Sequence, residues 1–166
     1  MNCSNLTTIN LPNCTYIGSN AFYSCTNLSM IDFSNCSYIG SKAFYGCHNL
    51  LYANFQQRVT IGSSAFGACS NLSCVKFQQC SYIGSYAFTN CSKLQSIYIL
   101  DSAVPFLYSY VFGNTPLINS TFLSGVYGSI YVRKSLLFSF KLSSGWSVYS
   151  SRFVGLTDEE IANLPF

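Results

Sequence analysis

The residues best suited to chemistry in this 166-residue chain are nine cysteines, one histidine and five carboxylates. Cysteines in such number could form disulfides, hold a zinc ion or act as nucleophiles. Five of them recur at one constant spacing, namely Cys3, Cys25, Cys47, Cys69 and Cys91. This spacing indicates a structural repeat, in which each cysteine occupies the same place in successive turns of the chain.

The cysteines are predicted to form a ladder of small, buried and unpaired thiols. Stacked turns lie about 4.8 Å apart and point equivalent Cβ atoms the same way, so a disulfide between neighbouring rungs would be strained. Nine cysteines cannot all pair within one chain, and the sequence has no C-x-x-C pair. Disulfides and a four-ligand zinc site stay as alternatives to the ladder. If the thiols are unpaired, their number suggests a reducing or anaerobic environment.

The histidine and the carboxylates do not form a recognisable catalytic group. His48 follows Cys47 directly, and adjacent residues of an extended segment point apart. Asp32 and Asp101 are about three turns apart, or roughly 14 Å, which exceeds the spacing of a glycosidase pair. The sequence lacks the motifs of a nucleophilic serine, a phosphate loop or a zinc protease. We therefore expect no catalytic residues, no metal and no cofactor.

The composition and the distribution of charged and apolar residues argue against nucleic-acid binding and against insertion into a membrane. Charged residues make up 8% of the chain, against about 25% in an average soluble domain. The eight Lys and Arg are scattered, so nucleic-acid binding, which usually needs a basic stripe, is not expected. The sequence has no run of about 18 apolar residues and no basic start followed by an apolar stretch, so neither membrane insertion nor a signal peptide is expected.

The elements that position these residues follow from the repeat unit, which reads C-x-N-L-x-x-I-x-[LF]-x-x-C-x-x-I-G-x-x-A-F-x-x. A unit as short as this cannot bury its own apolar face, but stacked copies share one core. L-x-x-I-x-[LF] is predicted to form a strand of a parallel sheet, and I-G-x-x-A-F to return the chain through short helical turns and extended segments. The glycine suits either a positive φ or a close approach of neighbouring turns. One asparagine column is predicted to form stacked amides: Asn5, Asn27, Asn49 and Asn71.

The pattern divides the chain into five repeats of about 22 residues over residues 1–114 and a degenerate last turn with a C-terminal cap over residues 115–166. In the cap, a strand is predicted at 130–132 and a short helix at 135–142. Aromatic residues are predicted to cover the last open turn: Trp146, Tyr149 and Phe153. Thr157 and Glu160 form a capping-box pattern, which predicts a last short helix.

One position interrupts the repeat. Arg58 stands where the constant spacing of the repeat places Cys14, Cys36 and Cys80 in other turns. An arginine can replace a buried thiol only if its guanidinium group reaches solvent. This column must therefore lie near solvent, or the Arg58 side chain must extend out of it.

These columns resemble the BspA-like, or bacterial-surface-antigen type, leucine-rich repeat family. The resemblance rests on the strand and return motifs and covers residues 3 to about 114. The ending at 130–149 also resembles that of the family, although Arg133 stands where a proline is frequent. The resemblance implies a leucine-rich-repeat solenoid of the α/β horseshoe class, dominated by strands. It further implies a non-enzymatic protein at the cell surface or secreted, of a kind of which several members are thought to bind host proteins.

The outward positions of the predicted strands differ from one repeat to the next, and we interpret them as a partner-binding face. They form two columns: Thr8, Met30, Tyr52, Cys74 and Ser96, and then Asn10, Asp32, Asn54, Lys76 and Tyr98. Repeat proteins bind partners through such extended faces, and tyrosine offers a large contact area at low entropic cost. The hypothesis is therefore adhesion to a protein partner, such as a host extracellular protein. A solvated face with no partner is the alternative.

Two other functions stay open. The repeats could form a structural spacer or assemble end to end, because the first turn shows no cap and would leave an open strand edge for self-association. Carbohydrate binding by exposed tyrosines is the third hypothesis.

Overall fold

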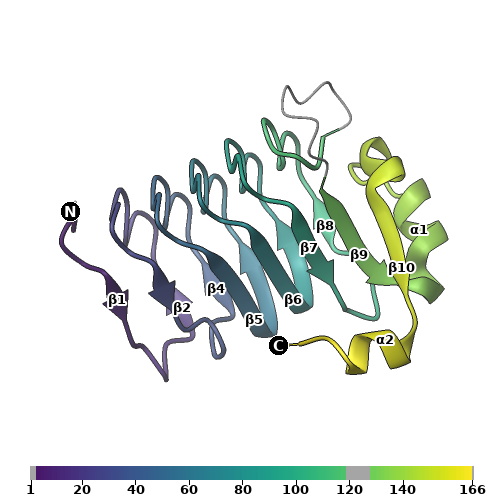
Figure 1. Cartoon of the computed structure of the whole chain (residues 1–166), viewed down its shortest axis with the longest axis horizontal. Coiled ribbons are helices and arrows are strands. Elements are labelled where there is room, and N and C mark those ends of the chain that lie inside the picture. The colour runs from purple at the N-terminus through teal and green to yellow at the C-terminus, as the bar shows by residue number, and fades with distance from the viewer. Residues whose placement is uncertain (1–2, 119–127, 166) are drawn as a thin grey trace.

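The computed structural model describes residues 3–118 and 128–165 and shows a stack of similar coils closed at one end by a helical cap (Figure 1). All strand pairs within the described residues are parallel. The main sheet has the order β10-β9-β7-β6-β5-β4-β2, with β8 beside β6, and β1 and β3 form a separate pair. No helix among the described residues has the length and apolarity needed to cross a membrane.

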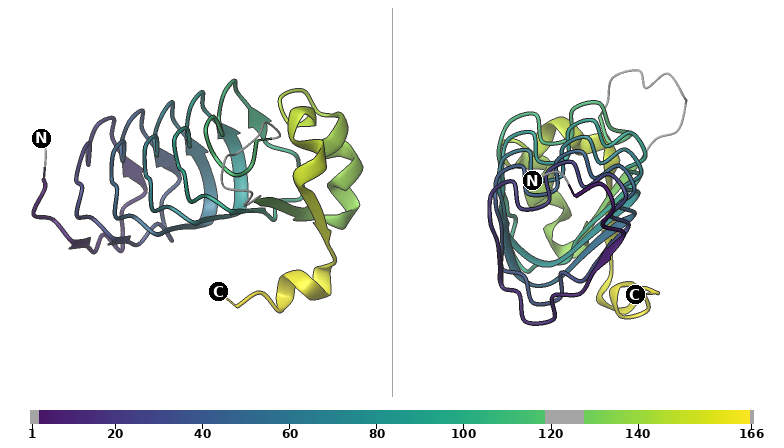
Figure 2. Two further views of the ribbon diagram at one scale, coloured as in Figure 1. Left: turned by 45° about the horizontal axis from the view of Figure 1, so that its top comes forward. Right: turned by 90° about the vertical axis from the view of Figure 1, so that its left-hand side faces the viewer.

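Each coil contributes strands to two sides of the stack (Figure 2). The front strands are β1 (Thr8–Ile9), β3 (Met30–Ile31), the first parts of β5 (Tyr52–Ile61) and β6 (Cys74–Ile83), β7 (Ser96–Ile99), β9 (Ser129–Arg133) and β10 (Phe153–Leu156). The rear strands are β2 (Tyr16–Ile17), β4 (Tyr38–Ile39), the second parts of β5 and β6, and β8 (Phe106–Leu107). The front strands other than β10 overlap the predicted strand segments, and the rear strands supply the extended part of the return.

The core consists of identical side chains stacked at one coil spacing. Phe22, Phe44, Phe66, Phe88 and Phe112 form one row, with ring centroids 5.1, 5.2, 5.4 and 5.9 Å apart. A second row contains Phe33, Phe55 and Phe77, with centroids 4.9 and 5.3 Å apart. The leucines Leu28, Leu50, Leu72 and Leu94 are fully buried beside them. Such rows give each coil the contacts that it cannot make alone.

The return segments form tight turns instead of the predicted helical turns. The Ala21 amide donates to the Gly18 carbonyl at 3.3 Å, and the Cys25 amide to the Phe22 carbonyl at 3.2 Å. The third residue of each turn has a positive φ, 57° at Asn20 and 54° at Ser24. The same two positions repeat along the chain as Lys42, Ser64, Tyr86 and Tyr110, and as Gly46, Ala68, Asn90 and Asn114. A left-handed residue at every fourth position prevents a right-handed helix from continuing.

The repeated glycine serves close approach between coils. A Cβ on Gly40 would lie 2.4 Å from the Ser19 amide nitrogen, and one on Gly62 would lie 2.7 Å from the Ser41 nitrogen. Neither glycine has a positive φ, so the first of the two roles expected for it is wrong and the second is confirmed.

Arg58 does not occupy the cysteine position. The register shifts between Phe55 and Arg58, so that Val59 lies opposite Cys80 and Arg58 lies opposite Gln79. Val59 is fully buried, and Cys80 is 2% exposed, so this column does not lie near solvent. The bulge lets the Arg58 side chain, which is 50% exposed, leave the core and pair with Asp101 at 3.2 Å.

The cap contains the elements that the sequence predicts there, with one strand, β10, and one 3-10 helix, η2, in addition. After β9 come η1 (Lys134–Leu136), α1 (Leu137–Leu142), η2 (Ser147–Arg152), β10 and α2 (Asp158–Ala162). Trp146 is fully buried, and its Nε1 donates to the Pro105 carbonyl at 2.8 Å. The ring centroids of Trp146 and Tyr149 lie 6.1 and 5.3 Å from that of Phe112, so these two rings cover the end of the phenylalanine row.

The last helix is fixed by its first turn. Thr157 and Glu160 form the predicted capping box, with the Thr157 amide donating to Glu160 at 2.7 Å. These hydrogen bonds lower the pKa of Glu160. Arg133 donates to the Leu100 carbonyl and forms an ion pair with Asp158. Arg133 thereby connects the last coil to α2.

Candidate functional site

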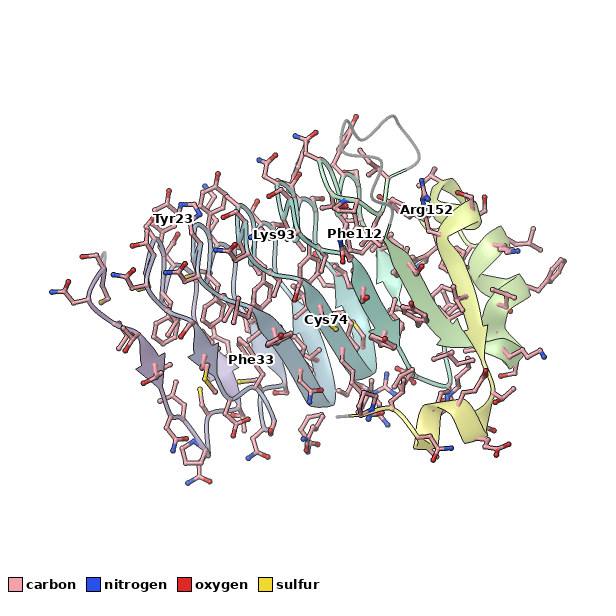
Figure 3. The ribbon with its side chains drawn as sticks, in the orientation of Figure 1. Tyr23, Phe33, Cys74, Lys93, Phe112 and Arg152 are labelled. Carbon is pink, nitrogen blue, oxygen red and sulfur yellow. The ribbon has the colours of Figure 1, made fainter. Side chains whose placement is uncertain are left out.

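Eight of the ten residues of the proposed face lie on the front strands, and Asn10 and Asp32 directly follow β1 and β3. Strand pairing places Thr8 opposite Met30, and Tyr52 opposite Cys74. Further along the sheet, Cys74 lies opposite Ser96 and Lys76 opposite Tyr98. Figure 3 shows Cys74 on β6 within this face.

Two adjoining hollows run along this face. The first, of about 340 Å³, is lined by Thr8, Ile9, Asn10, Ser29, Met30, Ile31, Asp32 and Tyr52. The second, of about 300 Å³, is lined by Tyr52, Ala53, Asn54, Cys74 and Lys76. Tyr52 belongs to both hollows, which makes them one groove across the N-terminal coils. Of the ten proposed residues, only Ser96 and Tyr98 line neither hollow.

Exposure is uneven along the face. Met30 and Tyr52 are 67% and 63% exposed, whereas Lys76 is only 5% exposed and Tyr98 is half-buried. The Tyr98 ring stacks on Tyr131 with centroids 4.5 Å apart, and burial raises the pKa of Tyr98. The strand register places Lys76 in the predicted outward column, but its side chain is nearly buried, so the predicted exposure is wrong for this residue. The accessible part of the face is therefore the N-terminal groove.

Opposite charges stand at the two ends of the groove. Asp32 accepts a hydrogen bond from the Ser34 amide at 2.8 Å, and hydrogen bonds from Ser34 lower the pKa of this carboxyl, which keeps it ionised. At the other end, burial lowers the pKa of Lys76. Burial also raises the pKa of the Cys74 thiol to about 11, so the thiol is protonated and a poor nucleophile at neutral pH.

Asn54 carries an unused acceptor in the second hollow. Its Oδ1 is buried and accepts no hydrogen bond from any described residue. A buried polar atom without a partner costs free energy, because it has lost water and gained nothing in exchange. A donor brought in by a partner would remove that cost.

Four of the five repeated cysteines lie inside the stack, whereas Cys3 in the first coil is exposed, so the predicted burial is wrong there. Cys25, Cys47, Cys69 and Cys91 are fully buried, and the thiols of the last three donate to the carbonyls of Phe22, Phe44 and Phe66, each at 3.1 Å. All nine cysteines fall within the described residues and are unpaired. Burial raises the pKa of Cys47 and of Cys91 to about 12. Within residues 3–118 and 128–165, no group of three or more metal-ligating side chains could hold a metal ion.

The other candidate chemical residues lie apart from one another. His48 is exposed, with Nδ1 3.0 Å from the Ala68 carbonyl oxygen, whereas Cys47 beside it is fully buried. Asp101 is buried and accepts from the Cys80 amide at 3.1 Å as well as from Arg58, whereas Asp32 lies on the front face. Among the described residues, these groups do not assemble into an acid–base or nucleophile–base pair.

Three of the four residues of the predicted asparagine column form stacked amides, whereas Asn27 Nδ2 donates to the Ser4 carbonyl and not to Asn5. Asn49 Nδ2 donates to Asn27 Oδ1, and Asn71 Nδ2 donates to Asn49 Oδ1, each at 3.4 Å. Lys93, which follows in the same column, donates to Asn71 Oδ1 at 2.8 Å. The amides therefore bond from coil to coil along the turns.

One polar site was not found from the sequence. A hollow of about 220 Å³ near the ends of the front strands is lined by Gln56, Gln78, Gln79, Leu100, Asp101, Ser102 and Arg133. The break of the cysteine column at Arg58 was the available signal, because it marks the bulge and the ion pair to Asp101. The bulge itself depends on pairing between coils, which the sequence does not display.

Comparison with known proteins agrees with the architecture. The family model of the BspA type leucine rich repeat region matches residues 1–119 in six copies. No curated protein matches the chain. A crystal structure of a leucine-rich repeat protein from Bacteroides ovatus shares 17% sequence identity over 93% of this chain, with a TM-score of 0.34, and this chain spans 55% of its length. The family match covers well over half of the sequence, so the predicted leucine-rich-repeat fold is confirmed and the chain belongs to the BspA-type leucine-rich repeat family.

Proposed function

We propose that this chain is a non-catalytic adhesion module that binds a protein partner in the groove of the front face. Leucine-rich repeat families typically act in protein interactions and not as enzymes, which supports the general class. The groove around Tyr52 is the observation that carries the proposal, because it is hollowed, mostly apolar and built from residues that differ between coils. In this proposal, residues 1–114 supply the binding surface and residues 115–166 close the end of the stack.

The groove suits an extended segment of a protein. Met30 and Tyr52 offer exposed apolar area for an anchoring side chain, which is the usual centre of an interface. The Asn54 Oδ1 atom would accept a hydrogen bond from a backbone N–H of that segment. Asp32 at one end of the groove would favour a basic neighbour, since its carboxyl stays ionised.

We propose a surface or secreted location for the module, with its thiols kept reduced. Proteins with BspA-type repeats are commonly surface-associated, which supports the location. The buried thiols donate hydrogen bonds to carbonyls of the preceding coils, and this arrangement favours a ladder without disulfides. Titration of thiols in unfolded, unreduced protein tests this part, and fewer than about six reactive thiols would contradict it.

The binding test compares two tyrosines with the same exposure. Tyr52 lies in the groove and Tyr16 on rear strand β2, and both are 63% exposed. Purified extracellular-matrix proteins are screened for binding by biolayer interferometry, and each hit is measured again with Tyr52→Ala and Tyr16→Ala. We expect Tyr52→Ala to weaken binding about tenfold or more and Tyr16→Ala to leave it unchanged. Equal binding by both variants would show that the groove is not the contact surface.

A second candidate, end-to-end self-association, is favoured by the first coil. In the described chain, β1 pairs only with β3, and β2 pairs only with β4, so one edge of each is open. Phe22 at the end of the phenylalanine row is only partly buried. Light scattering over a range of concentrations tests this candidate, and a monomer at all concentrations would exclude it.

A further inference from the structure

A group of exposed aromatic residues lies on the rear strands, away from the front groove. The Tyr108 ring packs edge-on against Tyr82 and against Phe106, with centroids 4.9 Å apart in both pairs. Phe106 is 61% exposed and Tyr108 is 45% exposed. Aromatic side chains gathered at a surface in this way usually mark a binding site.

The group borders a hollow between the fifth coil and the cap. This hollow has a volume of about 560 Å³, and its walls include Tyr108, Tyr110, Asn114, Val148 and Tyr149. None of the described residues that line it is charged. The walls therefore combine aromatic faces with hydroxyl and amide groups but offer no ionic contact.

The backbone holds the polar and aromatic side chains of this hollow in place. Tyr110 and Asn114 both have a φ of 55°, because they occupy the left-handed positions of the two tight turns. The Tyr110 ring stacks on Tyr86 at 5.3 Å, and Asn114 Nδ2 donates to Asn90 Oδ1 at 2.8 Å. A site whose side chains are already oriented loses little entropy when a ligand binds.

We propose that this hollow, with Tyr108 and Tyr110 as its stacking platforms, is a second binding site that takes a neutral oligosaccharide. A sugar ring has an apolar face of C–H groups, which packs on an aromatic ring, and a rim of hydroxyls, which bond to amides and hydroxyls. An anionic ligand would require a basic group, and the described lining residues supply none. The polar groups of Asn114 and Ser109 match hydroxyls better than they match a wholly apolar surface.

This inference is independent of the proposed protein-binding groove. The hollow is lined by the turns that follow rear strand β8 and by the cap, whereas the groove is lined by β1, β3, β5, β6 and the residues beside them. Either site can fail its test without affecting the other.

The test titrates the whole chain with three neutral probes, maltohexaose, cellohexaose and N-acetylchitohexaose, followed by saturation-transfer difference NMR and protein chemical shifts. We expect at least one probe to bind, and binding to persist in high salt because no ion pair contributes. Tyr108→Ala should weaken it about tenfold or more. Tyr110→Asn is the second variant, since asparagine tolerates the left-handed backbone at that position.

Matched controls separate the outcomes. Tyr16→Ala and Tyr52→Ala remove exposed tyrosines elsewhere and should bind the probes as the parent does, and thermal unfolding confirms that each variant is folded. The proposal is overturned if none of the three probes binds at 10 mM. It is also overturned if folded Tyr108→Ala and Tyr110→Asn bind unchanged, or if a sulfated hexasaccharide binds more tightly than the neutral probes.

Discussion

The two sides of strands β5 and β6 obey different constraints. On the inner side, Ala53 and Phe55 face the core and lie opposite Val75 and Phe77, and all four are buried. On the outer side, Tyr52 and Asn54 lie opposite Cys74 and Lys76, which share neither size nor charge with them. Stacking therefore dictates the inner rows, whereas the outer columns can change without disturbing the coil. This separation is what allows one repeated fold to carry a specific binding face.

The largest effect is expected on the inner side. Phe55 is fully buried between Phe33 and Phe77, with centroids 4.9 and 5.3 Å away. Phe55→Ala would leave a cavity in the row and should lower the free energy of unfolding by about 3–5 kcal/mol. Urea denaturation measures the change, and a loss below about 1 kcal/mol would mean that the row does not support the stack.

The buried thiols of the inner side should make the free energy of unfolding depend on pH. Burial raises the pKa of Cys47 and Cys91 to about 12 from an ordinary value of 9.0. Their stabilising contribution is complete below pH 9, and it is lost as the pH rises toward 12, because the unfolded chain releases these protons first. We expect stability to fall by about 1.4 kcal/mol per pH unit for each such thiol in that window. Cys91→Ala should make the free energy of unfolding fall less steeply with pH, by the contribution of one thiol. An unchanged slope would contradict the raised pKa of Cys91.

A buried and an exposed carboxylate, Asp101 and Asp32, are expected to differ by a smaller amount in their effect on stability. Asp101 is 2% exposed and accepts from the Cys80 amide and from Arg58, whereas Asp32 is exposed on the front face. Asp101→Ala should cost about 1–3 kcal/mol, because the Cys80 amide loses its partner in a buried place. Asp32→Ala is the matched control, expected within about 0.5 kcal/mol of the parent. Equal melting curves for the two variants would remove the structural role of the Asp101 contact.

The smallest effect is expected on the outer side. Tyr52→Ala removes a ring that is 63% exposed, so the free energy of unfolding should change by no more than about 0.5 kcal/mol. A loss of several kcal/mol at this position would mean that the face also supports the fold.

Much of this organisation could be predicted from the sequence, because identical residues at one spacing reveal which side chains share a row. The front strands of the repeats and the phenylalanine and leucine rows followed in this way, whereas the capping box of α2 followed from the pattern of Thr157 and Glu160. The helical turns were wrong, because the sequence of the return segments does not show the left-handed residues at Asn20 and Ser24. Counting by the repeat length also misplaced Arg58, since a bulge moves Val59 into its place.

The candidate site was predictable in outline only. Alternation along the strands selects the outward columns, but burial depends on what lies over each coil. Lys76 is therefore nearly buried while Met30 is open. The groove around Tyr52 and the unpartnered Asn54 acceptor could be found only in the three-dimensional structure. Both depend on how deeply each side chain is buried, which the repeat period does not reveal.

The central claim, that the outer side of the front strands serves recognition and not folding, is tested most directly by sorting a displayed library. Met30, Asp32, Tyr52, Asn54 and Cys74 are randomised together, and each variant is scored for protease resistance and for binding to the partner identified with the parent chain. We expect most variants to stay resistant while losing the partner. A library whose resistant members bind as the parent does, or whose members mostly lose resistance, would contradict the claim.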